Sequence, residues 1–232
     1  MSEDTGQPHP GGAGRPRRAE GARRARTRRP RGSLAPGVIL VAAEAVAREG
    51  FDALTMRAVA ARLGAAPMAL YNHFATKDEL VDALLDRVLS RFSPAPPTDD
   101  WLADLGDFAR AHRRLLADHA WAVSQLFARP SPGLGAVRIG ELALAILERG
   151  GITGDRAVAV FSGVIAFNYG WSSFTAARDL DPGGPSHDVA AALAMLPAER
   201  FPLTVGVAAE MGHYGSHEHY ELVLGQLLGG LR

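Results

Sequence analysis

The segment LTMRAVAARLGAAPMALYNHFATKDELVDALL, residues 54–85, decides the fold of this chain. Thr55 can cap a helix that runs through MRAVAARL, and Gly64 can take the left-handed conformation that ends it. Pro67 can open a second, short helix to Phe74, because proline is tolerated in the first helical turn. Two helices joined by so tight a turn form a helix-turn-helix unit, whose second helix fits the major groove of DNA.

Helical patterns flank this unit on both sides. Upstream, Ser33 or Pro36 can open a helix over about 36–49, and Gly50 can close it. Downstream, Thr76 precedes acidic residues that suit the first turn of a helix. The apolar face predicted for that helix comprises Leu80, Val81, Leu84, Leu85, Val88, Leu89 and Phe92.

The segment SPAPPTDD, residues 93–100, marks a domain boundary, because its three prolines cannot continue a helix. Beyond it the apolar spacing stays helical, and no alternation is long enough for a strand. We predict an all-α chain with an arm at 1–32, a helix-turn-helix domain at 33–92 that ends in a linker helix, and a larger helical domain at 93–232. The helices expected there cover about 100–117, 119–128, 134–149, 154–178, 188–196, 203–212 and 216–231, with a loop at 181–188.

Charge is distributed unevenly along the 232 residues, although the formal net charge is zero. Residues 15–31 carry nine arginines, so residues 1–31 have a net charge of +6 and the rest of the chain −6. Such a basic, Gly- and Pro-rich arm is expected to be disordered when free and to meet an anionic partner. Nucleic acid is the leading candidate. A membrane surface is the weaker one, because the arm has no large apolar residues.

The composition and the start of the chain exclude several classes of protein. The chain has no cysteine, which removes disulfides, thiolate metal sites and cysteine nucleophiles. We find no apolar run of membrane-spanning length and expect no membrane protein. Arg28 and Arg29 precede an apolar stretch as in a twin-arginine export signal, but Glu44 interrupts that stretch and its apolar residues recur with helical spacing. A cytoplasmic location is therefore expected.

The helix-turn-helix segment resembles the DNA-binding domain of the TetR family of transcriptional regulators. The resemblance implies a homodimer on a double-stranded, pseudo-palindromic operator and a C-terminal domain that binds an unknown small-molecule effector. The resemblance favours a repressor that binds its operator and is released by that effector. The matching residues are Thr55, Arg57, Ala60, Leu63, Gly64, Leu70, Tyr71, His73, Phe74, Lys77 and Leu80.

The resemblance also implies roles at the first half of this segment. Thr55 and Arg57, at the start of the first helix of the unit, would contact phosphate or reach a base. Pro67, Met68 and Ala69 would face bases and offer apolar contact alone, for instance to thymine methyl groups. Direct base readout is therefore thin, and specificity depends on Arg57, Asn72 and the arm. The arm either reads the minor groove or is a non-specific tail.

Further contacts to DNA are implied at the second half of the segment. Tyr71 and His73 would hydrogen-bond phosphates, and Asn72 would read a base or a phosphate. Lys77, the only lysine in the chain, would pair with a phosphate at the start of the next helix. Two neighbouring apolar side chains are expected in the core instead, Leu70 and Phe74.

In the C-terminal domain, the helices at about 154–178 and 216–231 would pair with their symmetry mates in a four-helix bundle. The alternative is that their apolar residues form the domain's own core, and for Leu227 and Leu231 the two readings stay open. The apolar residues concerned are Val158, Phe161, Val164, Ile165, Leu222, Leu227, Leu228 and Leu231.

Candidate effector-binding residues are those that are costly to bury without a purpose, together with aromatic walls for a cavity. Each of them can equally be an ordinary core residue satisfied by the backbone. The set comprises Phe108, His112, Trp121, Gln125, Phe161, Asn168 and Trp171, with Phe127, Phe167 and Phe174 as further walls.

No cofactor and no metal site is expected. By the resemblance, the effector-chelating positions of the tetracycline repressor fall on Ser93 and Gln125, which argues against a magnesium–tetracycline effector. The cluster of His213, His217 and His219 is read as surface or interface, because glycines interrupt its helical spacing. No catalytic motif is present, so the alternative to an effector-responsive regulator is a constitutive or architectural DNA-binding protein whose C-terminal domain only dimerises.

Overall fold

The computed structural model describes residues 34–129, 133–179 and 189–231, and in this part of the chain every regular element is helical. The predicted all-α class is confirmed. The predicted arm at 1–32 and the predicted loop at 181–188 lie outside the described residues.

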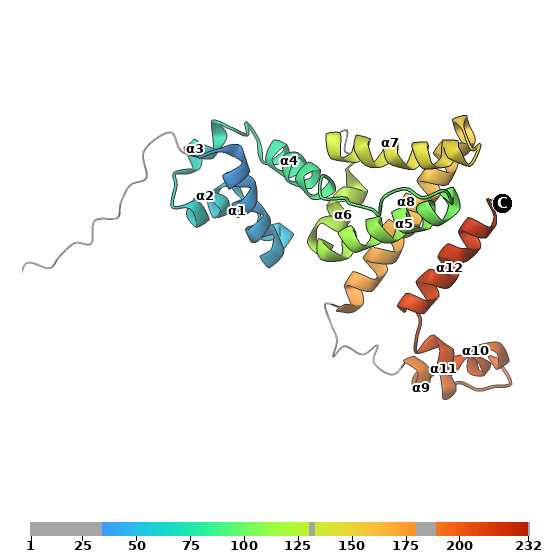
Figure 1. Cartoon of the computed structure of the whole chain (residues 1–232). Helices are drawn as coiled ribbons and strands as arrows, with labels where there is room; N and C mark the ends of the chain where they lie inside the picture. Colours follow the sequence, from blue (N-terminus) through green and yellow to red (C-terminus); the bar gives the residue numbers. More distant parts are fainter. Residues whose placement is uncertain (1–33, 130–132, 180–188, 232) are drawn as a thin grey trace, which may run out of the picture. The chain divides into compact units, whose positions relative to one another are not determined.

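The N-terminal helices begin at the predicted residues, and the first two α-helices also end where predicted. They are α1 (Pro36–Glu49), a 3₁₀ turn at Phe51–Ala53, α2 (Met56–Leu63), α3 (Pro67–Tyr71) and α4 (Lys77–Leu89) (Figure 1). The Thr55 hydroxyl accepts a hydrogen bond from the Ala58 N–H at 3.1 Å, and Gly64 has φ 64° and ψ 28°. Thr76 caps α4 in the same way, accepting from the Glu79 N–H at 3.1 Å.

Helix α3 is shorter than the predicted span of 67–74. The chain leaves the helix at Asn72, and the N–H groups of His73 and Phe74 both donate to the Leu70 carbonyl. This tight exit turns the Phe74 side chain into the core, where it is buried together with Leu70. Both residues are core, as predicted.

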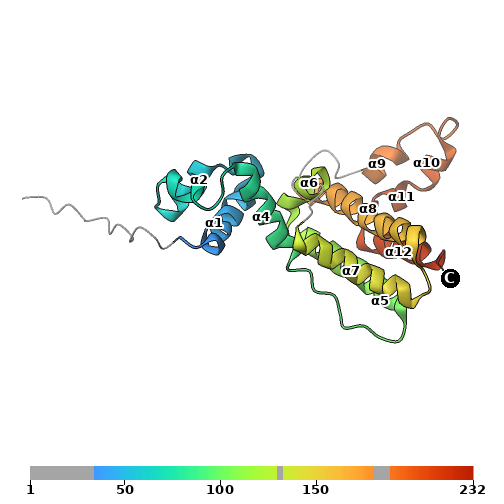
Figure 2. The same cartoon turned by 90° about the horizontal axis from the view of Figure 1, so that it is seen from above.

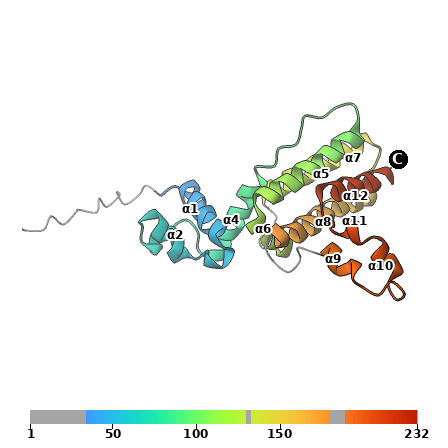
Figure 3. The same cartoon turned by 90° about the horizontal axis from the view of Figure 1, so that it is seen from below.

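The C-terminal helices are α5 (Trp101–Asp118), α6 (Ala120–Ala128), α7 (Leu134–Arg149), α8 (Gly154–Asp179), α9 (Val189–Ala194), α10 (Pro202–Gly206), α11 (Ala208–Met211) and α12 (His217–Gly229). Helix α5 is central, since it packs against α7, α8 and α12 (Figures 2 and 3). The single helix predicted over 203–212 is divided into α10 and α11, because Val207 leaves the helical region with φ −117° and ψ 19°.

Helix α4 joins the N-terminal helices to the C-terminal ones. Its residues pack against α1 on one side and against α6 and α7 on the other. The contact with α7 is close, because a Cβ added to Gly135 would lie 2.8 Å from the Asp86 carbonyl oxygen. The Gly135 N–H also donates to the Asp86 carboxylate at 2.7 Å. Glycine at this position therefore allows α7 to begin against the backbone of α4.

A buried carboxylate strengthens the same junction. Glu44 of α1 is 7% exposed and accepts two hydrogen bonds from Arg91, at 2.6 and 2.7 Å, and one from Arg48 at 2.9 Å. The Arg91 guanidinium also meets Nε2 of His119, between α5 and α6, at 2.7 Å. Nδ1 of that ring donates to the Leu115 carbonyl at 2.8 Å, so Nε2 is the acceptor from Arg91.

These partners hold the pKa of Glu44 at about 2, below its ordinary value of 4.5, chiefly through the hydrogen bonds from Arg91. A carboxylate with a lowered pKa in the folded state stabilises the fold fully above its unfolded pKa. That stabilisation is lost as the pH falls from about 4.5 toward about 2.

We expect Glu44→Gln to lower the free energy of unfolding at pH 7 by about 2 kcal/mol, because Arg91 loses its charged partner in a mostly buried site. Urea denaturation at fixed protein concentration measures the change. Glu49→Gln is the control. Glu49 forms an exposed ion pair with Arg62, and loss of this pair should lower the free energy of unfolding by less than about 1 kcal/mol. Equal costs for the two variants would contradict the role given to Glu44.

Candidate DNA-binding surface and effector pocket

Eight of the nine side chains predicted to contact DNA are exposed on or beside α2, α3 and the start of α4. Ala69 is the exception and is half-buried. Met68 is 72% exposed, unusual for so apolar a side chain and suited to contact with a base or a methyl group. The exposed residues are Thr55, Arg57, Pro67, Met68, Tyr71, Asn72, His73 and Lys77.

The local fold explains how α3 presents these side chains. Leu70 is fully buried under the helix, and Phe74 is buried just after it. Tyr71, one residue from Leu70, is 44% exposed. The Thr55 hydroxyl accepts from the backbone of α2, so its own proton stays available for a phosphate oxygen. The Lys77 ammonium lies 5.7 Å from the centre of the Phe51 ring and remains exposed.

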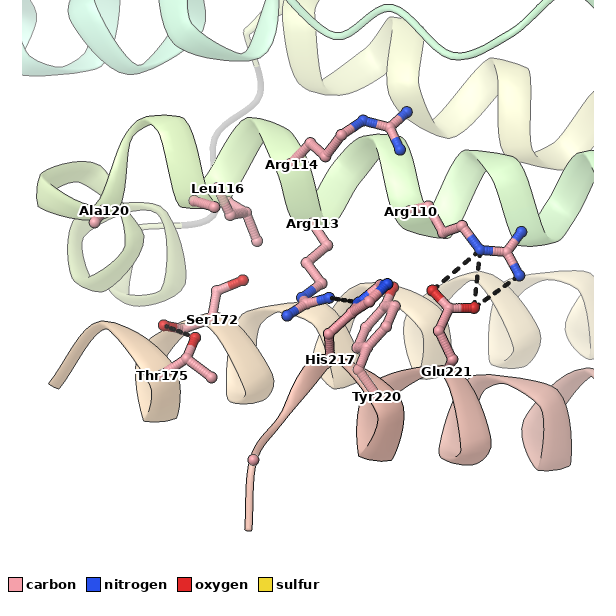
Figure 4. Close-up of a pocket in the computed structure, with 12 residues that line it drawn as sticks. Arg110, Arg113, Arg114, Leu116, Ala120, Ser172, Thr175, His217, Tyr220 and Glu221 are labelled. Carbon is pink, nitrogen blue, oxygen red and sulfur yellow. Dashed lines mark hydrogen bonds and ion pairs between the residues drawn. The ribbon is translucent and has the colours of Figure 1, made fainter. Parts of the chain in front are cut away.

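An open pocket of about 820 Å³ lies between α5, the second half of α8 and the start of α12. Its walls are partly apolar and partly cationic, and Figure 4 shows the side chains around it. The lining residues are Arg110, Arg113, Arg114, Leu116, Ala117, Ala120, Ser172, Thr175, Gly215, His217, Tyr220 and Glu221.

The seven residues predicted to bind an effector are not among those that line this pocket. Asn168 is completely buried, and its amide donates to the Ala109 carbonyl at 2.9 Å and lies 3.3 Å from Nδ1 of His112. The Tyr220 hydroxyl donates to the Asn168 side-chain oxygen at 2.9 Å, while the Tyr220 residue lines the pocket. Asn168 and His112 therefore form a layer behind Tyr220.

The other five predicted residues are buried or half-buried elsewhere in the C-terminal helices. Phe108 is fully buried and meets Phe92 edge to face at 5.1 Å between ring centres. Phe161 is half-buried and packs under Gly140. Trp121, Gln125 and Trp171 are half-buried. Their part in effector binding stays a prediction.

Three buried polar atoms near the pocket have no hydrogen-bond partner among the described residues. They are the indole nitrogens of Trp121 and Trp171 and the hydroxyl oxygen of Ser172. Burying a polar group without a partner costs about 1–3 kcal/mol, so such groups mark places where a ligand can bind. Ser172 is the one that lines the pocket.

The cationic side of this pocket was not predicted from the sequence. Arg110, Arg113 and Arg114 stand at spacings of three and four along the helix predicted at 100–117. Residues so spaced share one helix face, and Leu116, three residues after Arg113, is buried at its edge. This spacing in the sequence indicates that the three arginines can line a site within the protein as well as face solvent.

The apolar residues predicted to form the dimer are divided between core and surface. Val164 is buried, whereas Val158 is 53%, Leu222 61% and Leu227 45% exposed. The others, Phe161, Ile165, Leu228 and Leu231, are half-buried. Apolar side chains of α8 and α12 therefore stay uncovered in a single chain.

One expectation from the sequence needs correction. Residues Gly154–Thr175 of α8 are long and apolar enough to cross a membrane by length and composition, with a mean hydropathy of 1.2, although no such run was expected. Small alanine, glycine and serine residues interrupt the large apolar ones in this run, so its apolar character is weak in the sequence. A packed helix of a soluble protein passes the same test, so this finding is weak evidence for a membrane span.

Within the described ranges, no group of three or more histidines and acidic residues is placed to hold a metal ion. His213 and His217 are separated by the turn at Gly215, whose φ is 84°. His217 instead meets the guanidinium of Arg113 at 2.9 Å.

Burial lowers the pKa of His112 to about 4 from the ordinary 6.5. The folded protein then binds fewer protons than the unfolded chain between these two values, so stability falls as the pH drops from 6.5 toward 4. We expect His112→Gln to remove most of this slope, up to about 1.4 kcal/mol per pH unit, in urea denaturation at pH 7, 6 and 5. His73→Gln, at an exposed histidine, should keep it. An unchanged slope in His112→Gln would show that the ring is not neutral and buried in solution.

Comparison with known protein families accounts for nearly the whole described chain. The family model for bacterial regulatory proteins of the tetR family matches residues 38–84, and the model for the tetracyclin repressor-like C-terminal domain matches residues 93–232.

Individual relatives agree with the family models. An HTH-type transcriptional regulator of Saccharopolyspora erythraea is 31% identical over 184 residues, which cover 78% of this chain and 77% of that protein. The tetracycline repressor protein class A from transposon 1721 of Escherichia coli is 31% identical over 154 residues, 65% of this chain and 71% of that protein.

Among solved structures, ActR of Streptomyces coelicolor in complex with actinorhodin has a TM-score of 0.77 and 25% identity and covers 85% of this chain and 96% of its own. These relatives are transcriptional regulators and not enzymes, in agreement with the predicted class. The chain belongs to the TetR family of bacterial transcriptional regulators.

Proposed function

We propose that this regulator binds operator DNA as a homodimer, through α2 and α3, and is released when a small molecule enters the pocket between α5, α8 and α12. The pocket is the observation that carries the proposal. A volume of about 820 Å³ lies within the range typical of small-molecule sites. A constitutive DNA-binding protein, the alternative reading, has no need of such a pocket in the domain that only dimerises.

The DNA-binding part of the proposal is supported by exposure and chemistry. Tyr71 and Lys77 are exposed and can bind phosphates, which position the protein without reading the sequence. Arg57 and Asn72 are exposed and can make the bidentate contacts that identify a base. His73 and Thr55 add phosphate contacts, and Pro67, Met68 and Ala69 add apolar ones.

The dimer is proposed to form through α8 and α12. Val158, Leu222 and Leu227 are exposed in the single chain, and covering them in a symmetric four-helix interface would remove apolar surface from water. This placement also accounts for the apolar character of α8, because a dimer helix needs a second apolar face. We propose a cytoplasmic location, where the operator DNA is reached.

The effect of a bound molecule is proposed to travel from the pocket to α4. Helix α5 lines the pocket along one side and also packs against α6, α7 and α8. Helices α6 and α7 contact α4, and Arg129 at the end of α6 pairs with Asp78 and Asp82 of α4 at 2.7 and 3.1 Å. A small displacement of α5 is thereby passed to α4. This helix begins shortly after α3, the helix proposed to enter the major groove of DNA.

The size of the effect follows from linkage. In a two-fold dimer the recognition helices must match half-sites about 34–36 Å apart. An effector that binds better to a wrongly spaced dimer lowers operator affinity by its differential affinity alone, typically about 1–3 kcal/mol, or 5- to 150-fold. The structure of ActR with actinorhodin supports a small-molecule effector on this fold.

The first test concerns DNA contact. We expect Lys77→Ala to weaken binding equally on selected and on random DNA, and to reduce the slope of log affinity against log salt by about one, because one phosphate contact is lost. Arg57→Ala and Asn72→Ala should change which base is preferred. Gel-shift titrations on fragments selected by the protein from a random pool measure both effects.

Arg138→Ala is the control for these titrations, since Arg138 is an exposed arginine on α7, outside the DNA-binding helices. Its binding should match that of the parent. Unchanged affinity and salt slope for Lys77→Ala would remove this residue from the DNA-binding surface.

The second test concerns release. Ala117 lies exposed on α5 at the wall of the pocket, so Ala117→Trp would fill the cavity with an indole ring while leaving the core intact. Compounds that release the parent from its selected DNA should release Ala117→Trp at least about tenfold less effectively. Fluorescence anisotropy of labelled DNA follows the release.

The matched control is Ala103→Trp, at an exposed alanine of the same helix outside the pocket. It should respond like the parent. If no compound in a broad library releases the parent, or if both tryptophan variants respond alike, the constitutive reading is favoured.

A further inference from the structure

The cationic side of the pocket indicates the kind of molecule that it takes. Its lining holds three arginines, Arg110, Arg113 and Arg114, against one carboxylate, Glu221. The three arginines do not contribute equally, because their side chains have different partners.

The positive charge of Arg110 is already balanced by acidic partners. Its guanidinium donates three hydrogen bonds to Glu221, at 2.9, 3.0 and 3.2 Å, and one to Asp107 at 3.1 Å. These bonds lower the pKa of Glu221, so the pair stays ionised and internally compensated. Arg114 extends away from His217 and Tyr220 in Figure 4. Arg113 is thus the arginine that faces the pocket.

Arg113 is held in place without an acidic partner. Its guanidinium carbon lies 4.2 Å from the centre of the Tyr220 ring, and one of its nitrogens meets Nδ1 of His217 at 2.9 Å. Among the described residues no carboxylate forms an ion pair with it. A guanidinium fixed by a ring below it and a histidine at one side keeps further N–H groups for a planar, two-oxygen acceptor.

Tyr220 does not cancel this charge. Burial raises the pKa of its hydroxyl to about 12, and the hydroxyl donates to Asn168 at 2.9 Å. The ring therefore stays neutral and presents a face to Arg113.

A second polar group lies on the opposite wall. Ser172 of α8 is 5% exposed, and its hydroxyl has no hydrogen-bond partner in the described part of the chain. In Figure 4 this hydroxyl is directed across the pocket toward α5, which is the helix that carries Arg113. The neighbouring Thr175 hydroxyl is occupied with the carbonyls of Trp171 and Ser172. The serine is thus free to bind a polar group of a ligand.

Part of the remaining lining is apolar. Leu116, Ala117, Ala120 and the Tyr220 ring leave room for an aromatic body and offer few hydrogen-bonding groups to it. The pocket thus combines a fixed cation without an acidic partner, an unpaired hydroxyl and an apolar part of its wall.

We propose that the effector of this regulator is an aromatic carboxylic acid, whose carboxylate pairs with Arg113 and whose second polar group bonds to Ser172. The proposal rests on the proposed function, since it names the chemical class of the molecule that acts at the same pocket. A cationic molecule is disfavoured, because it would meet Arg113 without a free carboxylate to balance it.

Matched pairs of probes test the class directly. Naphthoate, anthracenecarboxylate and anthraquinonecarboxylate are compared with their primary amides, which keep the shape and lose the charge. Affinity for the full-length protein is measured by isothermal titration calorimetry at neutral pH. At least one acid should bind about tenfold or more tightly than its amide, as expected of a charge-assisted hydrogen bond.

Variants assign that preference to the residues. Arg113→Gln should bring the acid to the affinity of its amide and leave amide binding unchanged, which also shows that the pocket is still folded. Ser172→Ala should weaken both members of a pair by a similar factor. Arg138→Gln, an exposed arginine of α7, is the control and should keep the full preference for the acid.

Three results would overturn the proposal: amides that bind as well as their acids, an acid preference that survives Arg113→Gln, or no binding by any of the six probes. Failure of the proposed function would give results that differ from failure of the proposed effector class. Neutral compounds that release DNA would leave the effector-responsive function standing without this class. An acid that binds through Arg113 and never releases DNA would leave the class standing without that function.

Discussion

The Glu44–Arg91 ion pair is the interaction on which the arrangement of the N-terminal helices against the rest of the chain depends. It joins α1 to the chain just beyond α4 and extends through His119 to the turn between α5 and α6. A buried carboxylate is costly unless fully paired, so Glu44 requires these arginines to stay where they are. The junction is therefore specified by charge as well as by apolar packing, and α4 cannot slide along α1 without breaking it.

Much of the fold could be predicted because helix ends carry local chemical signals. Thr55, Gly64 and Thr76 cap their helices as predicted, and Pro36 begins α1. Prediction failed where tertiary contacts decide. The end of α3 at Tyr71 follows from the burial of Phe74, and the division of 203–212 at Val207 has no marker beyond Gly206, a weak helix former. The ion pair between Glu44 and Arg91 joins residues 47 apart and leaves no pattern in the sequence.

The two sites differ in how far the sequence determines them. The proposed DNA-binding surface lies on one short helix and its neighbours, so matching residues along the chain suffices to find exposed positions such as Met68 and Tyr71. The pocket is a concave space between three helices distant in sequence. Reasoning from costly buried residues identified His112 and Asn168, which form the layer behind the wall. It missed Arg113, because an arginine in a sequence is read as solvated unless its helix face is known.

The glycine at the start of α7 has a consequence for how these helices move. Gly135 lies against the backbone and side chain of Asp86 and has no side chain of its own to separate the two helices at this point. Side chains at most helix contacts change rotamer and absorb small shifts, whereas backbone in direct contact does not. At this point a shift of α7 meets α4 directly, so the two helices are expected to move together there.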